Sequence, residues 1–315
     1  MKKEFPQIHP ELQQVARRMP KLTYSKKNRW LIHVLTRFVP APKAPRDILI
    51  ENVFIPTAKD GTKIRLRIYK RESLPAPMPV LLWLHGGGYV MGNPEQDDGS
   101  CIRYVHELGI TVISVDYRFA PKYPFPTGLE DCYTALQWIV TQAPRLGVDA
   151  KRIAIGGASA GGGLAASLIH LAHDRQEIRP IFQLLVYPML DDRTVLRSEI
   201  DDHDHLVWNQ KSNRYGWESY LGTSCGAGNA PEYSVPARRT ELAGLPEAWI
   251  GVGTLDLFHD EDLAYAQRLQ EFGVKCELYT VPGAFHGFDV FDSQLPVVQD
   301  FRKSQILSLK KCFSL

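Results

Sequence analysis

Residues 155–164 read IGGASAGGGL and place a single serine, Ser159, among glycines and alanines. An apolar run, RIAI (152–155), precedes this stretch, and an apolar helical pattern, GLAASLIHLAH (163–173), follows it. A glycine-rich connection between a strand and a helix can bind phosphate, can expose a nucleophile on a sharp turn, or can be a tight turn without chemistry. The spacing of the residues separates these interpretations.

The spacing does not fit either common phosphate-binding motif. A dinucleotide fingerprint requires G-x-G-x-x-G, but counting from Gly157 places Ser159 at the third position, and counting from Gly161 places Ala166 at the last. A P-loop requires lysine and then serine or threonine after its second glycine, and here two further glycines follow Gly161. Without that lysine no side chain would hold the terminal phosphates.

The pattern G-x-S-x-G does fit, over residues 157–161. A strand before it and a helix after it are the context of a nucleophile elbow, in which the serine hydroxyl is exposed on a strained turn. Small neighbours are needed because such a turn brings the strand and the helix close together. The positive N-terminal end of the helix would also favour negative charge near Ser159. On this motif alone, a purely structural turn remains open.

A second glycine-rich loop, LHGGGYVMGN (84–93), can supply hydrogen-bond donors for an oxyanion. It follows a predicted strand and has the HGGG form found in lipases and esterases. We expect the backbone N–H groups of Gly87, Gly88 and Ala160 to form the oxyanion hole. In this interpretation His85 is a structural residue of the loop.

The base and the acid of a triad are expected later in the chain, in the order serine, acid, histidine. VPGAFHGFDV (281–290) places His286 in a loop after the last predicted strand, and GVGTLDLFHDED (251–262) places Asp256 directly after the strand before it. Asp260 and Glu261 compete with Asp256. We favour Asp256 because it lies nearest the strand end, and we expect the other two acids to cap the following helix.

The pattern of strands and helices predicts an α/β fold with eight strands. A hairpin is expected at 52–70, where KDGT marks a turn between alternating residues. Six short apolar runs, each typical of a strand buried on both faces, are found at 80–86, 110–116, 152–157, 182–188, 247–253 and 276–281. Helices are expected at 99–108, 127–142, 160–174, 261–272 and about 296–311. Such alternation favours a mostly parallel sheet covered by helices on both faces, and the hairpin would make one edge mixed.

Composition narrows the class of protein. The chain has 315 residues and a formal net charge of +2, so its charge gives no reason to expect nucleic-acid binding. The basic stretch at 16–29 is interpreted as a solvated helix face or arm. Five scattered cysteines without a CxxC pair suit a reducing compartment. No secretory leader or apolar run of membrane-spanning length is found, which predicts a soluble, cytoplasmic protein.

Two stretches, 1–45 and 190–240, do not fit the alternation of strands and helices. Within the second, Trp208, Trp217 and Tyr220 are candidates for walls of a substrate pocket, with ordinary packing as the alternative. Trp30 and Phe38 in the first stretch are more typical of a packed helix face. EIDDHDH (199–205) contains potential metal ligands, but its spacing matches no known metal motif, so we interpret it as a mobile polar loop in which His203 and His205 at most line a pocket.

Six motifs in order resemble the hormone-sensitive-lipase family of carboxylesterases. They are HGGG (85–88), DYRFAPKYPFPTGLED (116–131), GGASAGGGLA (156–165), YPMLD (187–191), GTLDLFHDED (253–262) and HGF (286–288). The resemblance implies an α/β-hydrolase fold and hydrolysis of short- to medium-chain acyl esters through Ser159, Asp256 and His286, with no metal or cofactor. It also implies a helical cap over the core. Residues 1–45 and 190–240 would form that cap, while 46–189 and 241–315 would form the catalytic core.

The sequence departs from this family at two positions. Many members carry an acidic residue before the nucleophile, where this chain has Ala158, and many have proline after the catalytic acid, where this chain has Leu257. Neither change removes a triad residue, so activity is expected. Amidase or lactonase activity would use the same triad and stays open. Receptor-like relatives lose the histidine that is present here as His286, and nothing favours a structural protein. A homodimer formed by pairing of the last strand with a second copy is a further hypothesis, testable by light scattering.

Overall fold

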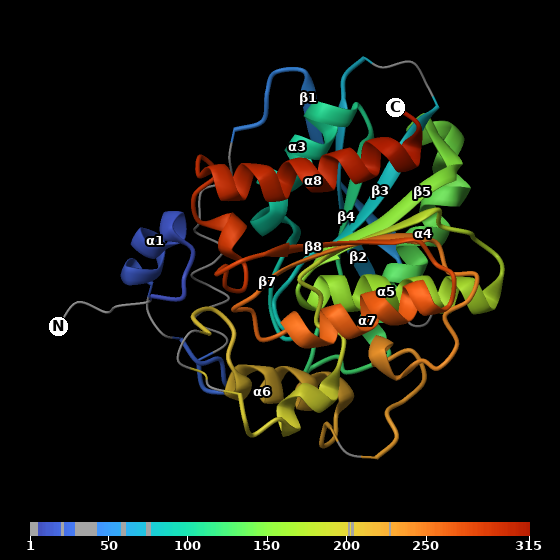
Figure 1. Cartoon of the computed structure of the whole chain (residues 1–315). Helices are drawn as coiled ribbons and strands as arrows, with labels where there is room; N and C mark the ends of the chain where they lie inside the picture. Colours follow the sequence, from blue (N-terminus) through green and yellow to red (C-terminus); the bar gives the residue numbers. More distant parts are fainter. Residues whose placement is uncertain are drawn as a thin grey trace.

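An eight-stranded sheet forms the centre of the molecule (Figure 1). The computed structural model describes residues 6–19, 22–28, 43–57, 61–73, 77–200, 202, 205–226 and 228–315. The strands are β1 (Ile48–Pro56), β2 (Lys63–Arg71), β3 (Met78–Leu84), β4 (Thr111–Asp116), β5 (Val148–Ala158), β6 (Phe182–Val186), β7 (Glu247–Gly253) and β8 (Cys276–Val281). All eight predicted strands are therefore present, with small differences at their ends.

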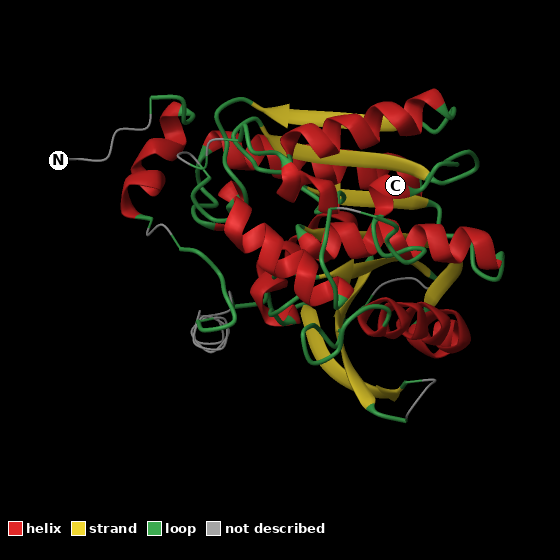
Figure 2. Ribbon diagram, turned by 90° about the horizontal axis from the view of Figure 1, so that it is seen from below, coloured by secondary structure: helices red, strands yellow, loops and turns green. Residues whose placement is uncertain are grey.

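The order of strands is β1-β2-β4-β3-β5-β6-β7-β8. β1 pairs antiparallel with β2, and β2 pairs antiparallel with β4. All later neighbours pair in parallel. The mostly parallel sheet with one mixed edge is thus confirmed, and Figure 2 shows how it twists from strand to strand.

Helices cover both faces of the sheet. The α-helices of the described residues are α1 (Gln13–Arg18), α3 (Asp98–Leu108), α4 (Thr127–Leu146), α5 (Ala160–Arg175), α6 (Gln210–Leu221), α7 (His259–Glu271) and α8 (Pro296–Phe313). Among them, α3 and α8 lie on one face, and α4, α5 and α7 lie on the other (Figure 1). No helix in the described ranges is long and apolar enough to cross a membrane.

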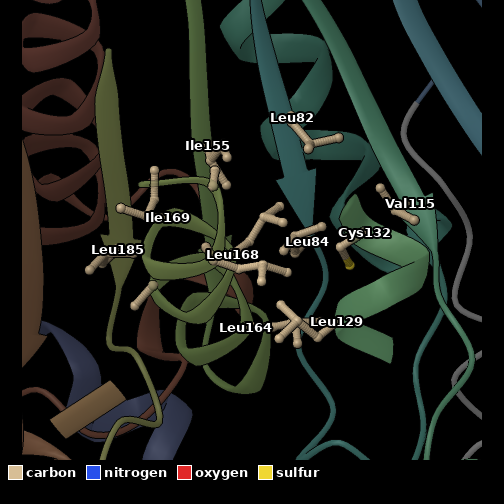
Figure 3. Packing of buried hydrophobic residues seen from close by; sticks show 14 of the residues in the cluster. Leu82, Leu84, Val115, Leu129, Cys132, Ile155, Leu164, Leu168, Ile169 and Leu185 are labelled. Atoms are coloured by element: carbon tan, nitrogen blue, oxygen red, sulfur yellow. The ribbon is translucent and has the colours of Figure 1, made fainter. Parts of the chain in front are cut away.

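The alternation of side chains along each strand divides the core in two. On β3, Leu82 and Leu84 belong to the cluster under α4 and α5, whereas Leu81 and Trp83 belong to the cluster under α3 and α8. All four side chains are buried, as expected for a strand covered on both faces. Figure 3 shows the first of these clusters, where side chains of β3 to β6 meet those of α4 and α5.

Three elements differ from the sequence prediction. The run at 276–281 was expected to be buried on both faces, and this is wrong: β8 lies at the edge of the sheet, and Glu277, Leu278 and Thr280 are exposed. An edge strand pairs with a neighbouring strand on one side only. Its apolar run therefore lies at the border of the core and is only partly buried. The other two elements are α1 and α6, for which the sequence indicated no range.

Candidate active site

Ser159 lies on the turn between β5 and α5 in a strained backbone conformation, with φ +58° and ψ −122°. Such a positive φ in a residue other than glycine costs about 1–3 kcal/mol and persists only when its surroundings fix it. Two hydrogen bonds do so here: the N–H of Ser159 donates to the carbonyl of Val186 at 2.9 Å, and its own carbonyl accepts from Met189 at 3.0 Å. The turn therefore has the conformation expected of a nucleophile elbow.

The two glycines of the motif are required by close backbone packing. A methyl group added to Gly161 would lie 2.0 Å from the carbonyl oxygen of Leu84, and one added to Gly157 would lie 2.4 Å from the carbonyl oxygen of Gly161. Any larger residue would push α5 away from β3. The expectation of small neighbours around Ser159 thus has a direct steric basis.

The structure brings Ser159, Asp256 and His286 together. Nε2 of His286 lies 2.9 Å from Oγ of Ser159, and Nδ1 lies 2.7 Å from Oδ2 of Asp256. The other carboxylate oxygen, Oδ1, accepts the backbone N–H of Phe258 at 2.9 Å. Asp256 follows β7 and His286 follows β8, so neighbouring parallel strands deliver both side chains to the end of the sheet where Ser159 lies. All three residues are buried, and this arrangement can carry a proton from a serine to an imidazole.

Two aromatic rings fix the plane of His286. Tyr187 meets the imidazole edge-on, with ring centroids 4.8 Å apart, and Phe258 does so at 5.1 Å. The hydroxyl of Tyr187 donates to Oδ1 of Asp289 at 2.8 Å. Burial, with the neighbouring Asp289 carboxylate, raises the pKa of Tyr187 well above its usual value, so the hydroxyl stays a donor. The sequence did not assign a function to Tyr187 or Phe258, because no spacing rule links either residue to His286. This holds even though Tyr187 belongs to the motif YPMLD (187–191).

The HGGG loop lies against the serine turn. A methyl group added to Gly86 would lie 3.4 Å from Cβ of Ser159. Gly87 and Gly88 have φ values of +127° and +59°, and their N–H groups donate to no other group within the described part of the chain. Ala160 is the first residue of α5, where N–H groups point out of the helix end. These three N–H groups are therefore free to bind an anion beside Ser159.

His85 belongs to the framework of this loop. Its ring stacks on Tyr117 with centroids 4.3 Å apart, and the Tyr117 hydroxyl donates to the His85 carbonyl at 2.7 Å. The side chain is fully buried. His85 therefore sits where the sequence placed it, within the loop and apart from the Ser159–His286 pair.

The two competing acids face away from His286. Asp260 is exposed and pairs with Arg197 at 2.8 Å. Glu261 is buried and accepts the backbone N–H of Leu190 at 2.7 Å, together with the Thr194 hydroxyl. Burial raises the pKa of Glu261 well above its usual value. Asp260 and Glu261 lie in the first turn of α7, as expected, but neither is the capping residue, because the N-cap position is Phe258 and its side chain makes no capping hydrogen bond. Glu261 instead fixes the chain that follows β6.

The three candidate pocket aromatics are all buried, and they contact the HGGG loop at different residues. Trp208 contacts Gly88 of the HGGG loop. Tyr220 stacks on Tyr89 with centroids 4.1 Å apart, and Trp217 lies 5.3 Å from Tyr89. Trp217 is fully buried and Tyr220 nearly so. Of the three, Trp208 touches Gly88, whereas Trp217 and Tyr220 contact the loop at Tyr89.

A mostly apolar cavity of about 480 Å³ lies beside this region. It is lined by Glu11, Gln14, Val15, Arg18, Met19, Leu22, Tyr24, Leu206, Val207, Phe291, Asp292 and Leu295. The ring of Tyr24 lies 5.3 Å from that of Trp208, which in turn touches Gly88. Two packed aromatic rings, Tyr24 and Trp208, therefore lie between this cavity and the HGGG loop.

The residues suggested as a metal-binding segment are only partly described. His203 lies outside the described residues, as do Trp30 and Phe38 of the N-terminal stretch. Nδ1 of His205 lies 3.1 Å from Oδ1 of Asp202. Over the positions that are described, no three His, Cys, Asp or Glu side chains gather as a metal site would require.

Comparison with known proteins agrees with this geometry. A family model described as the alpha/beta hydrolase fold matches residues 81–290. The chain belongs to this family. It is 33 % identical to the carboxylesterase NlhH of Mycobacterium tuberculosis over 80 % of each chain. It is also 32 % identical to an ethyl acetate hydrolase of Pseudomonas putida, over 74 % of this chain and 73 % of the relative.

Comparison with solved structures supports the same family assignment. A bacterial heroin esterase superposes with a TM-score of 0.89 at 33 % identity, covering 98 % of this chain and 99 % of that one. The resemblance to carboxylesterases of the hormone-sensitive-lipase family is confirmed, and so is the α/β-hydrolase fold. The chain is a hydrolase of the carboxylesterase class.

Proposed function

We propose that this α/β-hydrolase cleaves carboxylic esters with short to medium acyl chains, with Ser159 as the nucleophile. The observation that carries the proposal is the position of His286, whose Nε2 lies 2.9 Å from the serine oxygen. Its Nδ1 lies 2.7 Å from Asp256, which holds the imidazole in the tautomer that accepts a proton at Nε2. The similarity to an ethyl acetate hydrolase supports a short acyl group.

The reaction proceeds by acyl transfer. His286 takes the proton of Ser159 as its oxygen attacks the ester carbonyl, and later gives that proton to the departing alcohol. Asp256 stabilises the imidazolium formed between these steps. The N–H groups of Gly87, Gly88 and Ala160 bind the negative oxygen of the tetrahedral intermediate, and loss of one such donor typically costs about 3 kcal/mol of transition-state stabilisation. Water then releases the acid by the same steps in reverse order.

The apolar cavity between α1 and residues 291–295 accommodates the hydrocarbon part of the substrate. Its volume of about 480 Å³ is in the usual range for small-ligand pockets. Phe291 and Leu295 lie a few residues beyond His286, and Leu206 and Val207 come directly before Trp208. Trp208 lies between Tyr24, which lines this cavity, and Gly88 of the HGGG loop, and Trp217 and Tyr220 pack against Tyr89 of the same loop.

Residues 1–45 and 190–240 form the cap, and 46–189 with 241–315 form the catalytic core. Hydrogen bonds between the two cap stretches support this division: Nδ2 of Asn209 donates to the carbonyl of Leu22 at 3.1 Å, and the N–H of Tyr24 donates to Oγ of Ser212 at 2.9 Å. The insertion is also anchored to the core, since Leu190 and Val235 belong to the cluster around α5.

A cytoplasmic location and a homodimer are further proposals. The five cysteines are all free thiols, as a reducing compartment would keep them. β8 lies at an edge of the sheet, where a second copy could pair with it. Light scattering that gives a monomer mass would contradict the dimer.

The test of the proposed function is hydrolysis of p-nitrophenyl esters from acetate to palmitate by the wild type and by Ser159→Ala. Short esters should turn over in the wild type, and the variant should lose activity by several orders of magnitude. Ser167→Ala is the matched control, since Ser167 is a buried serine of the same helix, α5, and does not face His286. A folded wild type that cleaves no ester would overturn the ester proposal and direct attention to amides and lactones.

A further inference from the structure

The indole of Trp208 occupies the space beside the HGGG loop that a side chain at position 88 would need. A methyl group added to Gly88 would lie 2.0 Å from Cη2 of Trp208 and 2.7 Å from Cζ2. Gly88 has a φ of +59°, a conformation that its own lack of a side chain allows but does not impose. The edge of the indole is therefore the group that limits where Gly88 can move on this side.

Helix α6 supports the same contact from behind. A methyl group added to Gly216 would lie 2.8 Å from the carbonyl oxygen of Gly88 and 3.2 Å from Cζ2 of Trp208. Nε1 of Trp208 donates to Oδ1 of Asn213, one turn earlier in α6, at 3.3 Å. Trp208 is 4 % exposed, and Asn213 is fully buried. The helix thus holds both the indole and the carbonyl of Gly88.

The start of α6 is itself anchored by the N-terminal stretch. Oδ1 of Asn209 caps the helix by accepting the N–H of Ser212, while Nδ2 of Asn209 reaches residues 22–23. The ring of Tyr24 packs on the other side of Trp208. A continuous series of contacts therefore runs from residues 22–24 through α6 and Trp208 to Gly88.

We propose that Trp208 is a positioning residue that holds the N–H of Gly88 in line with the developing oxyanion, so that the cap completes the oxyanion hole. This inference rests on the proposed function, in which Gly88 donates to the tetrahedral intermediate. A donor displaced by about 1 Å loses most of its stabilising effect on the transition state, which corresponds to as much as about 100-fold in rate. The ester carbonyl of the bound substrate carries little charge, so its binding changes much less.

The experiment compares Trp208→Ala, Trp208→Phe and Gly216→Ala with the wild type on p-nitrophenyl acetate and butyrate. We expect kcat to fall by about 10- to 100-fold in Trp208→Ala with KM nearly unchanged, and the phenyl ring of Trp208→Phe to restore part of the loss. Gly216→Ala keeps the indole in the protein, but its methyl group would crowd both the Gly88 carbonyl and Cζ2 of Trp208, so it should displace Gly88 and lower kcat in the same way. Trp249→Phe is the matched control, because that buried indole lies under α8 and donates to Ser304.

A reversible probe of the oxyanion separates positioning from a pocket wall. An alkyl boronic acid forms a tetrahedral adduct with Ser159, and its inhibition constant should rise by about the same factor as kcat falls. Amide hydrogen exchange of residues 85–92, measured without substrate, should be faster in Trp208→Ala and Gly216→Ala than in the control. If Trp208→Ala changes only KM or the longest ester accepted, with unchanged boronate inhibition and exchange, Trp208 is a pocket wall and the proposal fails. A wild type that is inert on all esters would overturn the proposed function. Amide exchange would still show whether Trp208 holds Gly88 in place, because this measurement needs no substrate.

Discussion

Asp256 is one of three acidic residues within six positions, and only its carboxylate faces His286 at 2.7 Å. Asparagine at this position would keep the size of the side chain but would present an amide to Nδ1, which favours the wrong imidazole tautomer. We therefore predict that Asp256→Asn lowers kcat by about 10³- to 10⁴-fold. Steady-state kinetics on p-nitrophenyl acetate will measure the effect.

Asp260→Asn is the control for this prediction. Asp260 pairs with Arg197 at the surface, an interaction worth no more than about 1 kcal/mol of stability. Its loss should leave kcat unchanged. A larger loss of activity in Asp260→Asn than in Asp256→Asn would show that the acid has been assigned to the wrong residue.

At the level of single residues, the sequence predicts the triad because each member follows a predicted strand in a fixed order. It does not predict Tyr187 or Phe258, whose rings meet His286 from other parts of the chain. It also assigns Glu261 to a helix cap, whereas that side chain bonds the chain after β6. These contacts depend on how side chains are oriented across elements, which no local spacing encodes.

The connection between β5 and α5 requires glycine at position 161. A methyl group at Gly161 would lie 2.0 Å from the carbonyl oxygen of Leu84 and 2.5 Å from that of His85. Backbone atoms cannot move aside without shifting the HGGG loop. We predict that Gly161→Ala lowers the free energy of unfolding by about 3 kcal/mol or more and abolishes activity, as measured by urea denaturation and ester hydrolysis.

Gly273→Asn provides a comparison for this element. Gly273 has a φ of +76° and no atom within 4 Å of an added methyl group, so asparagine is tolerated there. Stability close to that of the wild type is expected for this variant. Equal destabilisation by the two substitutions would argue against steric exclusion as the reason for glycine at position 161.

Helix α1 gives a second prediction at this scale, because Val15 lines the proposed acyl cavity. A phenyl ring in its place would fill part of the space. We predict that Val15→Phe shortens the longest acyl chain accepted and leaves kcat on the acetate ester unchanged, measured over an ester series. Arg17→Ala, on an exposed position of the same helix, should leave the chain-length profile of the wild type intact. An unchanged profile in Val15→Phe would place the acyl group elsewhere.

Among whole elements, strands and helices of the core are predicted well because burial on both faces gives continuous apolar runs. α6 was not predicted, since its helical pattern is interrupted by Asn213 and Gly216, which the structure uses for contacts with Trp208 and Gly88. β8 was predicted as fully buried because an apolar run does not reveal which strand lies at the edge. Both errors concern tertiary position, which the local pattern does not contain.

For the molecule as a whole, the most enclosed of the described helices is α5, which packs on β3, β5 and β6, contacts α4, and meets α7 through His170 and Tyr265. Every residue from Ala160 to Ala172 is buried. A helix enclosed on all sides must keep its polar groups neutral, because burying an unpaired charge costs several kcal/mol. His170 satisfies this condition through Nε2, which lies 2.8 Å from the hydroxyl of Tyr265 in α7.

The stability of the molecule should therefore depend on the protonation of His170. Burial, reinforced by the positive charge of Arg239, lowers the pKa of His170 to about 3. In the unfolded chain the usual value is near 6.5. Between these values the unfolded chain binds a proton that the folded protein does not, so stability falls as the pH is lowered from about 6.5 to about 3 and is unaffected above that range. At pH 4.5 the contribution amounts to about 3 kcal/mol.

His170→Gln, which cannot take up this proton, tests the prediction. The free energy of unfolding, measured in urea from pH 7.5 to 4.5, should decrease less steeply in the variant than in the wild type, and the two curves should converge or cross on acidification. His106→Gln removes an exposed histidine and should follow the pH dependence of the wild type. A constant difference between wild type and His170→Gln over the whole range would mean that His170 is protonated alike in the folded and unfolded states, and that α5 is less tightly enclosed than its burial indicates.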